Sequence, residues 1–262
     1  MKTRRVGIIL ELIWPYRRHL DVFAGTQRFA AEAGNWECEI DEFHSDALRQ
    51  PKSQLERYDG IIARASEPLA KLAARAKVPV VNVLYQTKVR DQLTGVFPDF
   101  AKVGTEAAKH LLERGFRQFG CLSMPREAAH REAVSAFHQQ IANQGCHCQC
   151  AGGSRFYYRS HQSWVHFQEQ LDDWIGTWKP PIALFVAFND VTIRYVVHAC
   201  RRRGLRVPED VALIGATNEP MIGELPPPSL SSVEVSYEQI GYQAAQMLVQ
   251  MMKRKSKNRG TS

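Results

Sequence analysis

Residues 183–218 read ALFVAFND, VTIRYVVHACRRRG and LRVPEDVALIGATN, and this stretch decides the fold. Residues 183–188 are apolar without alternation, a pattern that is typical of a strand covered on both faces. Asn189 and Asp190 then offer an N-cap for a helix with one apolar stripe, and residues 211–215 predict a second buried strand. Because strand, helix and strand follow one another closely, the stretch predicts a right-handed βαβ unit of a parallel sheet.

Polar residues follow both of these strands. Asn189 and Asp190 leave the carboxyl end of the first, and Thr217 and Asn218 leave the carboxyl end of the second. In doubly wound sheets, ligands bind in the crevice beyond these ends. Amide, carboxylate and hydroxyl groups together suit a ligand that is rich in hydroxyls. An alternative stays open, in which Asn189 and Asp190 only cap the helix.

The segment GLRVPEDVALIG at residues 204–215 resembles the most repeated signature of the LacI/GalR-type regulators. Members of that family carry an effector domain related to periplasmic sugar-binding proteins. The resemblance implies an α/β, two-lobed periplasmic-binding-protein-like fold, in which two doubly wound parallel sheets are joined by crossing hinge strands. It also implies a sugar in the cleft between the lobes, contacted by the four polar residues named above. The family usually has an aspartate where this sequence has Thr217.

The remaining chain repeats the alternation of strand and helix, which predicts further parallel strands. In the first lobe we expect strands at residues 6–10, 36–43, 60–64 and 78–83. The second lobe opens with a strand at 119–122, and an amphipathic helix at 237–252 returns the chain to the first lobe. We therefore expect an N-terminal lobe of residues 1–104 plus 234–262 and a C-terminal lobe of residues 105–233.

Candidate ligand groups of the first lobe lie after its first strand and at its first crossing. Trp14, Tyr16 and Arg17 can place flat rings and a guanidinium over a sugar, although the same loop can be an ordinary surface loop. The resemblance puts Asp99 near the ligand at the first crossing between lobes. An aspartate near a helix start is also a common cap, and both readings stay open.

Candidate ligand groups of the second lobe are two arginines and a tryptophan. The family often places an arginine where this sequence has Ala133, and Arg126 and Arg131 are the nearest substitutes. Trp164 either lines the cleft or packs as a staple on its own helix.

Composition excludes several classes of protein. The 262 residues are 44% hydrophobic and 23% charged, as in a soluble globular protein. No apolar run approaches the roughly 20 residues that a membrane span needs, and the N-terminus lacks the pattern of a signal peptide. We therefore expect a cytoplasmic protein without a membrane partner. The net charge of +7 permits an anionic partner without requiring one.

Six cysteines in this length fit a reducing compartment, and we expect no disulfide framework. Residues 146–150 read CHCQC, which invites a zinc interpretation. Structural zinc pairs usually have the spacing C-x₂₋₄-C, whereas Cys146, Cys148 and Cys150 alternate. This alternation favours the inward face of one buried strand over a metal site.

The sequence shows no catalytic constellation. It contains no G-x-G-x-x-G or G-x-x-x-x-G-K-[ST] phosphate-binding motif, no H-E-x-x-H and no G-x-S-x-G. Its nine histidines are scattered without the spacing of metal ligands. We therefore predict a protein that is not an enzyme and has no catalytic residue, cofactor or metal. Two alternatives remain, a sugar receptor of transport or chemosensing and an enzyme on a doubly wound sheet.

The order of elements most closely resembles a xylose-responsive branch of the family, in which the effector domain precedes a helix-turn-helix module of the AraC type. The resemblance implies a pentose effector such as xylose, and operator DNA bound through a C-terminal module that these 262 residues lack. We also expect a homodimer. The basic residues at 253–259 then fit a solvated linker.

Overall fold

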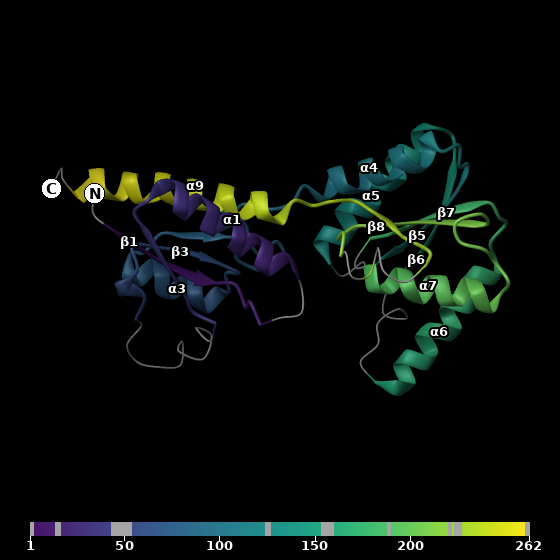
Figure 1. Cartoon of the computed structure of the whole chain (residues 1–262), viewed down its shortest axis with the longest axis horizontal. Coiled ribbons are helices and arrows are strands. Elements are labelled where there is room, and N and C mark those ends of the chain that lie inside the picture. Colours follow the sequence, from purple (N-terminus) through teal and green to yellow (C-terminus); the bar gives the residue numbers. More distant parts are fainter. Residues whose placement is uncertain are drawn as a thin grey trace. The chain divides into compact units, whose positions relative to one another are not determined.

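The computed structural model describes residues 3–13, 17–42, 54–123, 127–152, 160–187, 190–219, 222 and 227–259 (Figure 1). The chain forms two compact α/β units. Unit 1 comprises Met1–Pro98 and Ser236–Ser262, and unit 2 comprises Asp99–Val235. The sequence-based limit at residue 104 falls inside helix α4 (Phe100–Glu113), whose apolar face packs into the core of unit 2.

Unit 1 is a parallel sheet between two helical layers. Its strands, in spatial order, are β2 (Trp36–Ile40), β1 (Arg4–Ile9), β3 (Gly60–Ala63) and β4 (Val80–Asn82). Figure 1 shows α1 (Arg17–Ala33) and α9 (Tyr237–Arg259) on one face and α3 (Glu67–Ala76) on the other, beside the short helix η1 (Gln54–Arg57). Both faces of β1 and β3 are therefore covered, which explains their unbroken apolar sequence.

Two glycines allow α1 and α9 to cross at close range. A side chain at Gly25 would collide with the carbonyl oxygen of Glu238, and one at Gly241 would collide with that of Val22. Helix α9 joins unit 1 through this crossing although it lies more than 200 residues along the chain. The helix continues to Arg259, beyond the end at residue 252 that the sequence predicted.

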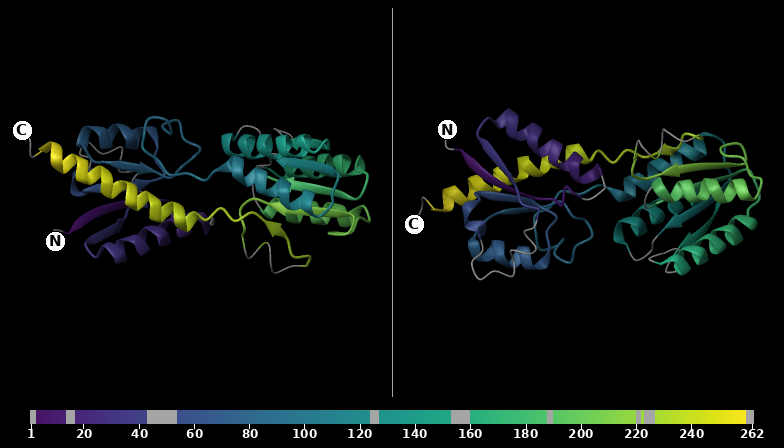
Figure 2. Two further views of the ribbon diagram at one scale, coloured as in Figure 1. Left: turned by 90° about the horizontal axis from the view of Figure 1, so that it is seen from above. Right: turned by 60° about the horizontal axis from the view of Figure 1, so that its bottom comes forward.

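Unit 2 repeats the same architecture with five parallel strands. In spatial order they are β6 (His147–Gly152), β5 (Gln118–Ser123), β7 (Ile182–Val186), β8 (Val211–Gly215) and β9 (Ser231–Ser232). Helices α4 and α5 (Ala128–Asn143) cover one face, and α6 (His161–Gly176) and α7 (Asp190–Arg202) cover the other (Figures 1 and 2). The predicted βαβ unit is confirmed as β7, α7 and β8.

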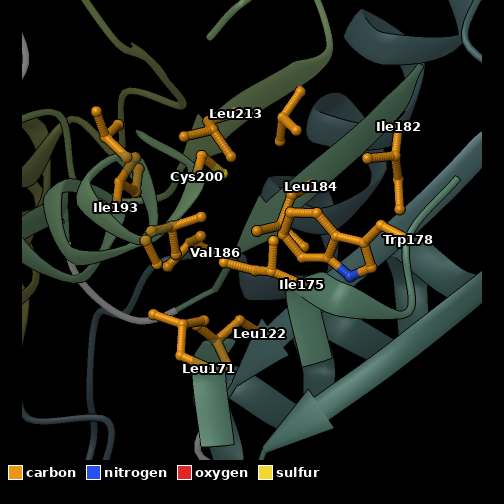
Figure 3. Close-up of a cluster of buried hydrophobic side chains, with 14 of the residues drawn as sticks. Leu122, Leu171, Ile175, Trp178, Ile182, Leu184, Val186, Ile193, Cys200 and Leu213 are labelled. Carbon is orange, nitrogen blue, oxygen red and sulfur yellow. The ribbon is translucent and has the colours of Figure 1, made fainter. Parts of the chain in front are cut away.

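The core of unit 2 between the sheet and helices α6 and α7 is shown in Figure 3. Leu184 and Val186 of β7 lie among Ile175 of α6 and Ile193 of α7, and all four are buried. Such a contiguous apolar layer holds the amino end of α7 firmly at the carboxyl edge of the sheet. The fold class predicted from the sequence, two doubly wound parallel sheets, is confirmed.

The cysteines differ from expectation. Cys121 and Cys150 form a disulfide, so the prediction that no cysteines pair is wrong. The two residues lie directly opposite each other in the register of β5 and β6. The prediction of one buried cysteine face is also wrong, since Cys148 is buried but Cys150 is exposed. Strand β6 is the edge of its sheet, and α5 covers only part of that face.

Within the described residues, no helix combines the length and the apolarity that crossing a bilayer would require.

Candidate functional site

The carboxyl edge of unit 2 gathers three of the predicted ligand residues. Asp190 opens α7, and Thr217 and Asn218 follow β8. Asp190 is 1% exposed. Its Oδ2 accepts a hydrogen bond from the Glu219 backbone N–H at 2.9 Å, and its Oδ1 accepts one from the Ser232 hydroxyl at 3.3 Å. The carboxylate therefore ties the start of α7 to the loop after β8.

Ser232 completes this network from the neighbouring strand β9. Its Oγ accepts hydrogen bonds from the backbone N–H of Thr217 at 3.2 Å and of Asn218 at 2.9 Å. Gly215 permits the close approach, because a side chain there would collide with Oδ1 of Asp190. Sequence reasoning missed Ser232 and Gly215 as parts of the site. The signal that could have found Ser232 is the extended segment at residues 230–233, which follows the loop after β8 and can pair with that strand.

One polar atom in this network has no partner. The hydroxyl oxygen of Thr217 is buried and makes no hydrogen bond within the described part of the chain. An unsatisfied buried hydroxyl destabilises a fold by about 1–3 kcal/mol, so native proteins rarely keep one without a reason. A ligand hydroxyl at this position would satisfy it.

Asn218 is held on the outer side of the same loop. Its φ of +46° lies in the left-handed region, which asparagine tolerates better than most residues. Its side-chain amide donates to Oε2 of Glu234 at 2.5 Å. The exposed amide is therefore oriented by an acidic neighbour before any ligand binds.

Arg194 of α7 fixes the far end of the loop. It is buried, and its guanidinium donates to the carbonyl oxygens of Ile222 and Pro228, both at 2.8 Å. Burial lowers the pKa of this arginine from its usual value. Asp190 at one end and Arg194 at the other thus hold the loop on α7, so its polar groups are preorganised.

The carboxyl edge of unit 1 carries charged groups that sequence reasoning missed. Arg64 directly follows β3, is largely buried and forms an ion pair with Glu11, which lies just beyond β1. The backbone carbonyl of Glu11 lies 2.9 Å from Nδ1 of the buried His19. Burial is the main reason that the pKa of His19 falls to about 4, so its ring is neutral at pH 7. The signal for Arg64 was its place at a strand end, the rule that pointed to Asp190.

Asn82 at the end of β4 closes this edge. It is fully buried, and its Oδ1 accepts from the backbone N–H of Ala65 at 3.0 Å and of Leu84 at 2.9 Å. Its amide donates to the carbonyl of Leu84 at 3.0 Å. Asn82 therefore shapes the loop after β4, as Asp190 shapes the loop after β8.

Four predicted site residues lie outside the described residues, namely Trp14, Tyr16, Arg126 and Asn189. Arg17 is exposed and pairs with Asp21 at 3.2 Å, and Asp99 caps α4 by accepting from the Lys102 N–H at 2.8 Å.

Two predicted site residues of unit 2 lie on helices. Trp164 stacks on Phe167 and meets Tyr195 edge-on with 4.7 Å between ring centres, so it packs α6 on α7. Arg131 is exposed on α5. Ala133, where the family often has arginine, is buried against Gly104 of α4, and this crossing has no room for a long side chain.

Comparison with known sequences places the chain among binding-protein-like domains. A family model described as a periplasmic binding protein-like domain matches residues 108–262, more than half of the chain. The xylose operon regulatory protein of Escherichia coli K12 is 26% identical over 262 residues, which cover 96% of this chain and 64% of the relative. Its namesake from Haemophilus influenzae is 27% identical over 232 residues, covering 83% and 56%.

Solved structures show the same fold. A structure of the xylose-binding transcription activator XylR aligns with a TM-score of 0.78 at 24% identity, over 97% of this chain and 64% of that one. A periplasmic binding protein/LacI transcriptional regulator from Alkaliphilus metalliredigens, in complex with D-xylulofuranose, aligns with a TM-score of 0.67 at 20% identity, over 96% and 91%.

These relatives are named as regulators and not as enzymes, in agreement with the prediction that this chain is not an enzyme. The chain spans less than two thirds of the length of the two curated relatives. The predicted resemblance is confirmed by a family match over more than half of the chain together with the shared fold. The chain belongs to the periplasmic binding protein-like domain family.

Proposed function

We propose that this chain is the sugar-sensing effector domain of a bacterial transcription regulator, and that its effector is an aldopentose such as xylose. The names of the relatives support the class of protein, and the bound D-xylulofuranose of one of them supports a pentose-sized ligand. The proposed protein works in the cytoplasm as a homodimer.

The observation that carries this proposal is the unpartnered hydroxyl of Thr217 in a preorganised loop beside Asp190. A sugar hydroxyl can donate to one oxygen and accept from another, so it fits a site where a threonine hydroxyl and a carboxylate lie together. We rank Thr217, Asp190 and Asn218 first as ligand groups, and we give Asn189 the same rank from the sequence alone.

The other predicted ligand groups remain part of the proposal at lower rank. The rings of Trp14 and Tyr16 would face the sugar, and Arg17 and Arg64 would add guanidinium donors in unit 1. Further groups proposed from the sequence are Asp99, Arg126, Arg131 and Trp164. The cap of Asp99 and the ring contacts of Trp164 already explain those two residues without a ligand.

We assign operator contact to a helix-turn-helix module outside these 262 residues. Helices α1 and α9 both use an apolar face in the core of unit 1, so neither is a free reading helix. Because the proposed ligand groups come from both units, sugar would favour the conformational state in which both sets bind it. Small-angle scattering tests this step, since an unchanged radius of gyration at saturating sugar would contradict it.

Isothermal calorimetry with a panel of pentoses and hexoses tests the proposal directly. We expect one pentose to bind with micromolar affinity, or about −8 kcal/mol, and without turnover. The absence of binding heat from every sugar in the panel would overturn the proposed function.

The variant Thr217→Val sharpens this test because it removes the hydroxyl and keeps the shape. Since the hydroxyl has no hydrogen-bond partner among the described residues, its loss should leave the free energy of unfolding unchanged or raise it by about 1 kcal/mol. Sugar affinity should fall about tenfold. The matched control is Thr105→Val on α4, whose hydroxyl bonds to its own helix at Ala101 and which should leave sugar affinity unchanged. Equal sugar affinity in both variants would contradict the assignment of Thr217.

A further inference from the structure

Four potential metal ligands converge at the edge strand of unit 2. They are Cys121 of β5, Cys148 and Cys150 of β6, and His138 of α5. One donor atom from each lies within 4.8 Å of the other three. His138 Nε2 is 2.8 Å from the sulfur of Cys150. Nothing in the proposed sugar site uses these side chains.

The fold brings the four residues together for simple geometric reasons. Cys148 and Cys150 are two residues apart on one strand, so their side chains point to the same face of the sheet. The parallel register sets Cys121 directly across from Cys150. Helix α5 covers this face through the buried Phe137, and its next residue, His138, therefore lies at the rim.

The donor set matches a known class of site. Three thiolates and one imidazole make up one of the common tetrahedral sets for structural zinc. Sulfur atoms around such an ion lie about 3.8 Å apart, as follows from zinc–sulfur bonds of about 2.3 Å. The sulfurs of Cys121 and Cys150, bonded to each other in the disulfide, must move apart to about 3.8 Å once it is reduced, whereas the other donor atoms, all within 4.8 Å, need shifts of about 1 Å.

The spacing C-x-C is shorter than the usual C-x₂₋₄-C, which was the reason to disfavour a metal from sequence. That usual spacing belongs to turns, where a tight loop must fold back to present both sulfurs. On a strand, alternation already presents residues i and i+2 together, and the remaining two ligands come from β5 and α5. The objection from spacing therefore does not apply to this geometry.

We propose that Cys121, Cys148, Cys150 and His138 bind one thiophilic metal ion of the zinc class when the Cys121–Cys150 disulfide is reduced. A thiol or phosphine reductant supplies the two electrons and is itself oxidised, and two protons complete the thiols. The ion then displaces a proton from each of the three thiols and binds neutral His138. The disulfide and the metal site exclude each other because they use the same two sulfurs.

Cobalt substitution tests this site on the whole, tag-free chain. The protein is reduced with a phosphine under anaerobic conditions, freed of reductant and titrated with Co²⁺. We expect one equivalent to give a sulfur-to-cobalt charge-transfer band with strong tetrahedral visible bands, and Zn²⁺ to abolish both. Unreduced protein should give no such band. Because the band reports sulfur ligands, weak binding by the other histidines does not imitate it.

Variants assign the ligands. Cys148→Ser should remove about one third of the charge-transfer intensity and weaken metal binding by tenfold or more, while His138→Gln should keep that band and weaken binding by about 10–100-fold. His138 is partly exposed, so this second variant should still fold. Cys146→Ser is the control, since Cys146 lies on the same segment but outside the cluster.

Two outcomes would overturn the proposal. One is a reduced protein without the charge-transfer band, and the other is a band whose intensity Cys148→Ser leaves unchanged together with a cobalt affinity that His138→Gln leaves unchanged. Either result would show that the cluster is a disulfide cross-link beside a free thiol.

Discussion

The two units share one architecture but build their carboxyl edges with different chemistry. In unit 2, Asp190 and Ser232 bind backbone N–H groups and fix the course of one loop. In unit 1, Arg64 forms an ion pair with Glu11, and the backbone carbonyl of Glu11 contacts the ring of the buried His19. The first edge is held by one carboxylate whose hydrogen bonds fix a loop, and the second by an ion pair together with the uncharged hydrogen bonds of Asn82.

This difference matters for ligand binding. Hydrogen bonds to backbone groups are directional and fix the positions at which a loop offers partners to hydroxyls. A partly buried ion pair is weakened by salt, although less than an exposed pair is. If the proposed function holds, we expect variants at the edge of unit 2 to change which sugar binds, and variants at the edge of unit 1 to change how binding depends on salt.

The largest effect should come from Asp190→Ala. The variant removes a charged acceptor of two hydrogen bonds and leaves the Glu219 N–H without its partner. We expect the free energy of unfolding to fall by about 4 kcal/mol and sugar affinity to fall by ten- to a hundredfold. Urea denaturation and calorimetry measure the two effects.

Asn82→Ala is the matched variant in unit 1, since Asn82 shapes its loop with three uncharged hydrogen bonds. It should lower the free energy of unfolding by about 2–3 kcal/mol. If Asn82→Ala lowered the free energy of unfolding as much as Asp190→Ala or more, the charged acceptor in unit 2 would not contribute more to stability than the uncharged one in unit 1.

The next largest effect is the pH dependence of unit 1 through His19. The pKa of His19 is about 4 in the folded protein, against 6.5 in the unfolded chain. As the pH falls below 6.5, the His19 ring binds a proton in the unfolded chain but stays neutral in the folded protein. The contribution of His19 to stability is therefore complete above pH 6.5 and is lost towards pH 4, by at most about 3 kcal/mol.

The difference between wild type and His19→Gln isolates this contribution from nearby carboxylates, which titrate in the same range. Urea denaturation at several pH values should show a smaller loss of stability on acidification in the variant. Besides burial, the charges of Arg64 and Arg18 lower the pKa of the ring, and the hydrogen bond with the backbone carbonyl of Glu11 raises it. If the free energy of unfolding changed with pH in the same way in both proteins, the pKa of His19 would not be lowered in the folded state.

Gly215→Ala should have a smaller effect. The added methyl group would collide with Asp190 Oδ1 and approach Ile193, so we expect a loss of about 2 kcal/mol in the free energy of unfolding. In an Asp190→Ala background the main collision is gone, and the same substitution should destabilise less. Equal losses in both backgrounds, measured as a double-mutant cycle, would exclude this contact as the cause.

The sequence predicted the fold well because its signals are local. Apolar runs such as residues 183–188 predict buried strands without knowledge of the partner strand. The limit of unit 2 was harder to predict, because α4 joins it through the close contact of Gly104 with Ala133, a pairing between distant residues. A periodic pattern shows that a helix has an apolar face but not which core that face joins.

The site was predicted only in part for the same reason. Asp190 and Thr217 follow strands, so a rule about strand ends finds them. Ser232 bonds to Asp190 from 42 residues away, and only the neighbouring position of β9 brings it there. The pairing of Cys121 with Cys150 likewise depends on the register of two strands, which a single sequence does not display.

The smallest effect on stability should come from Arg17→Ala. Because the variant stays stable, any change in its sugar affinity reports a direct contact of Arg17 with the ligand. Arg17 is exposed and forms an ion pair with Asp21 one helical turn away, worth about 0.3–0.5 kcal/mol. Asp21→Ala breaks the same pair from the other side and serves as the control. If Arg17 also contacts the sugar, Arg17→Ala should weaken binding about tenfold, while Asp21→Ala leaves affinity nearly unchanged. Calorimetry that finds the same affinity in both variants would remove Arg17 from the ligand groups and leave Arg64 as the guanidinium donor of unit 1.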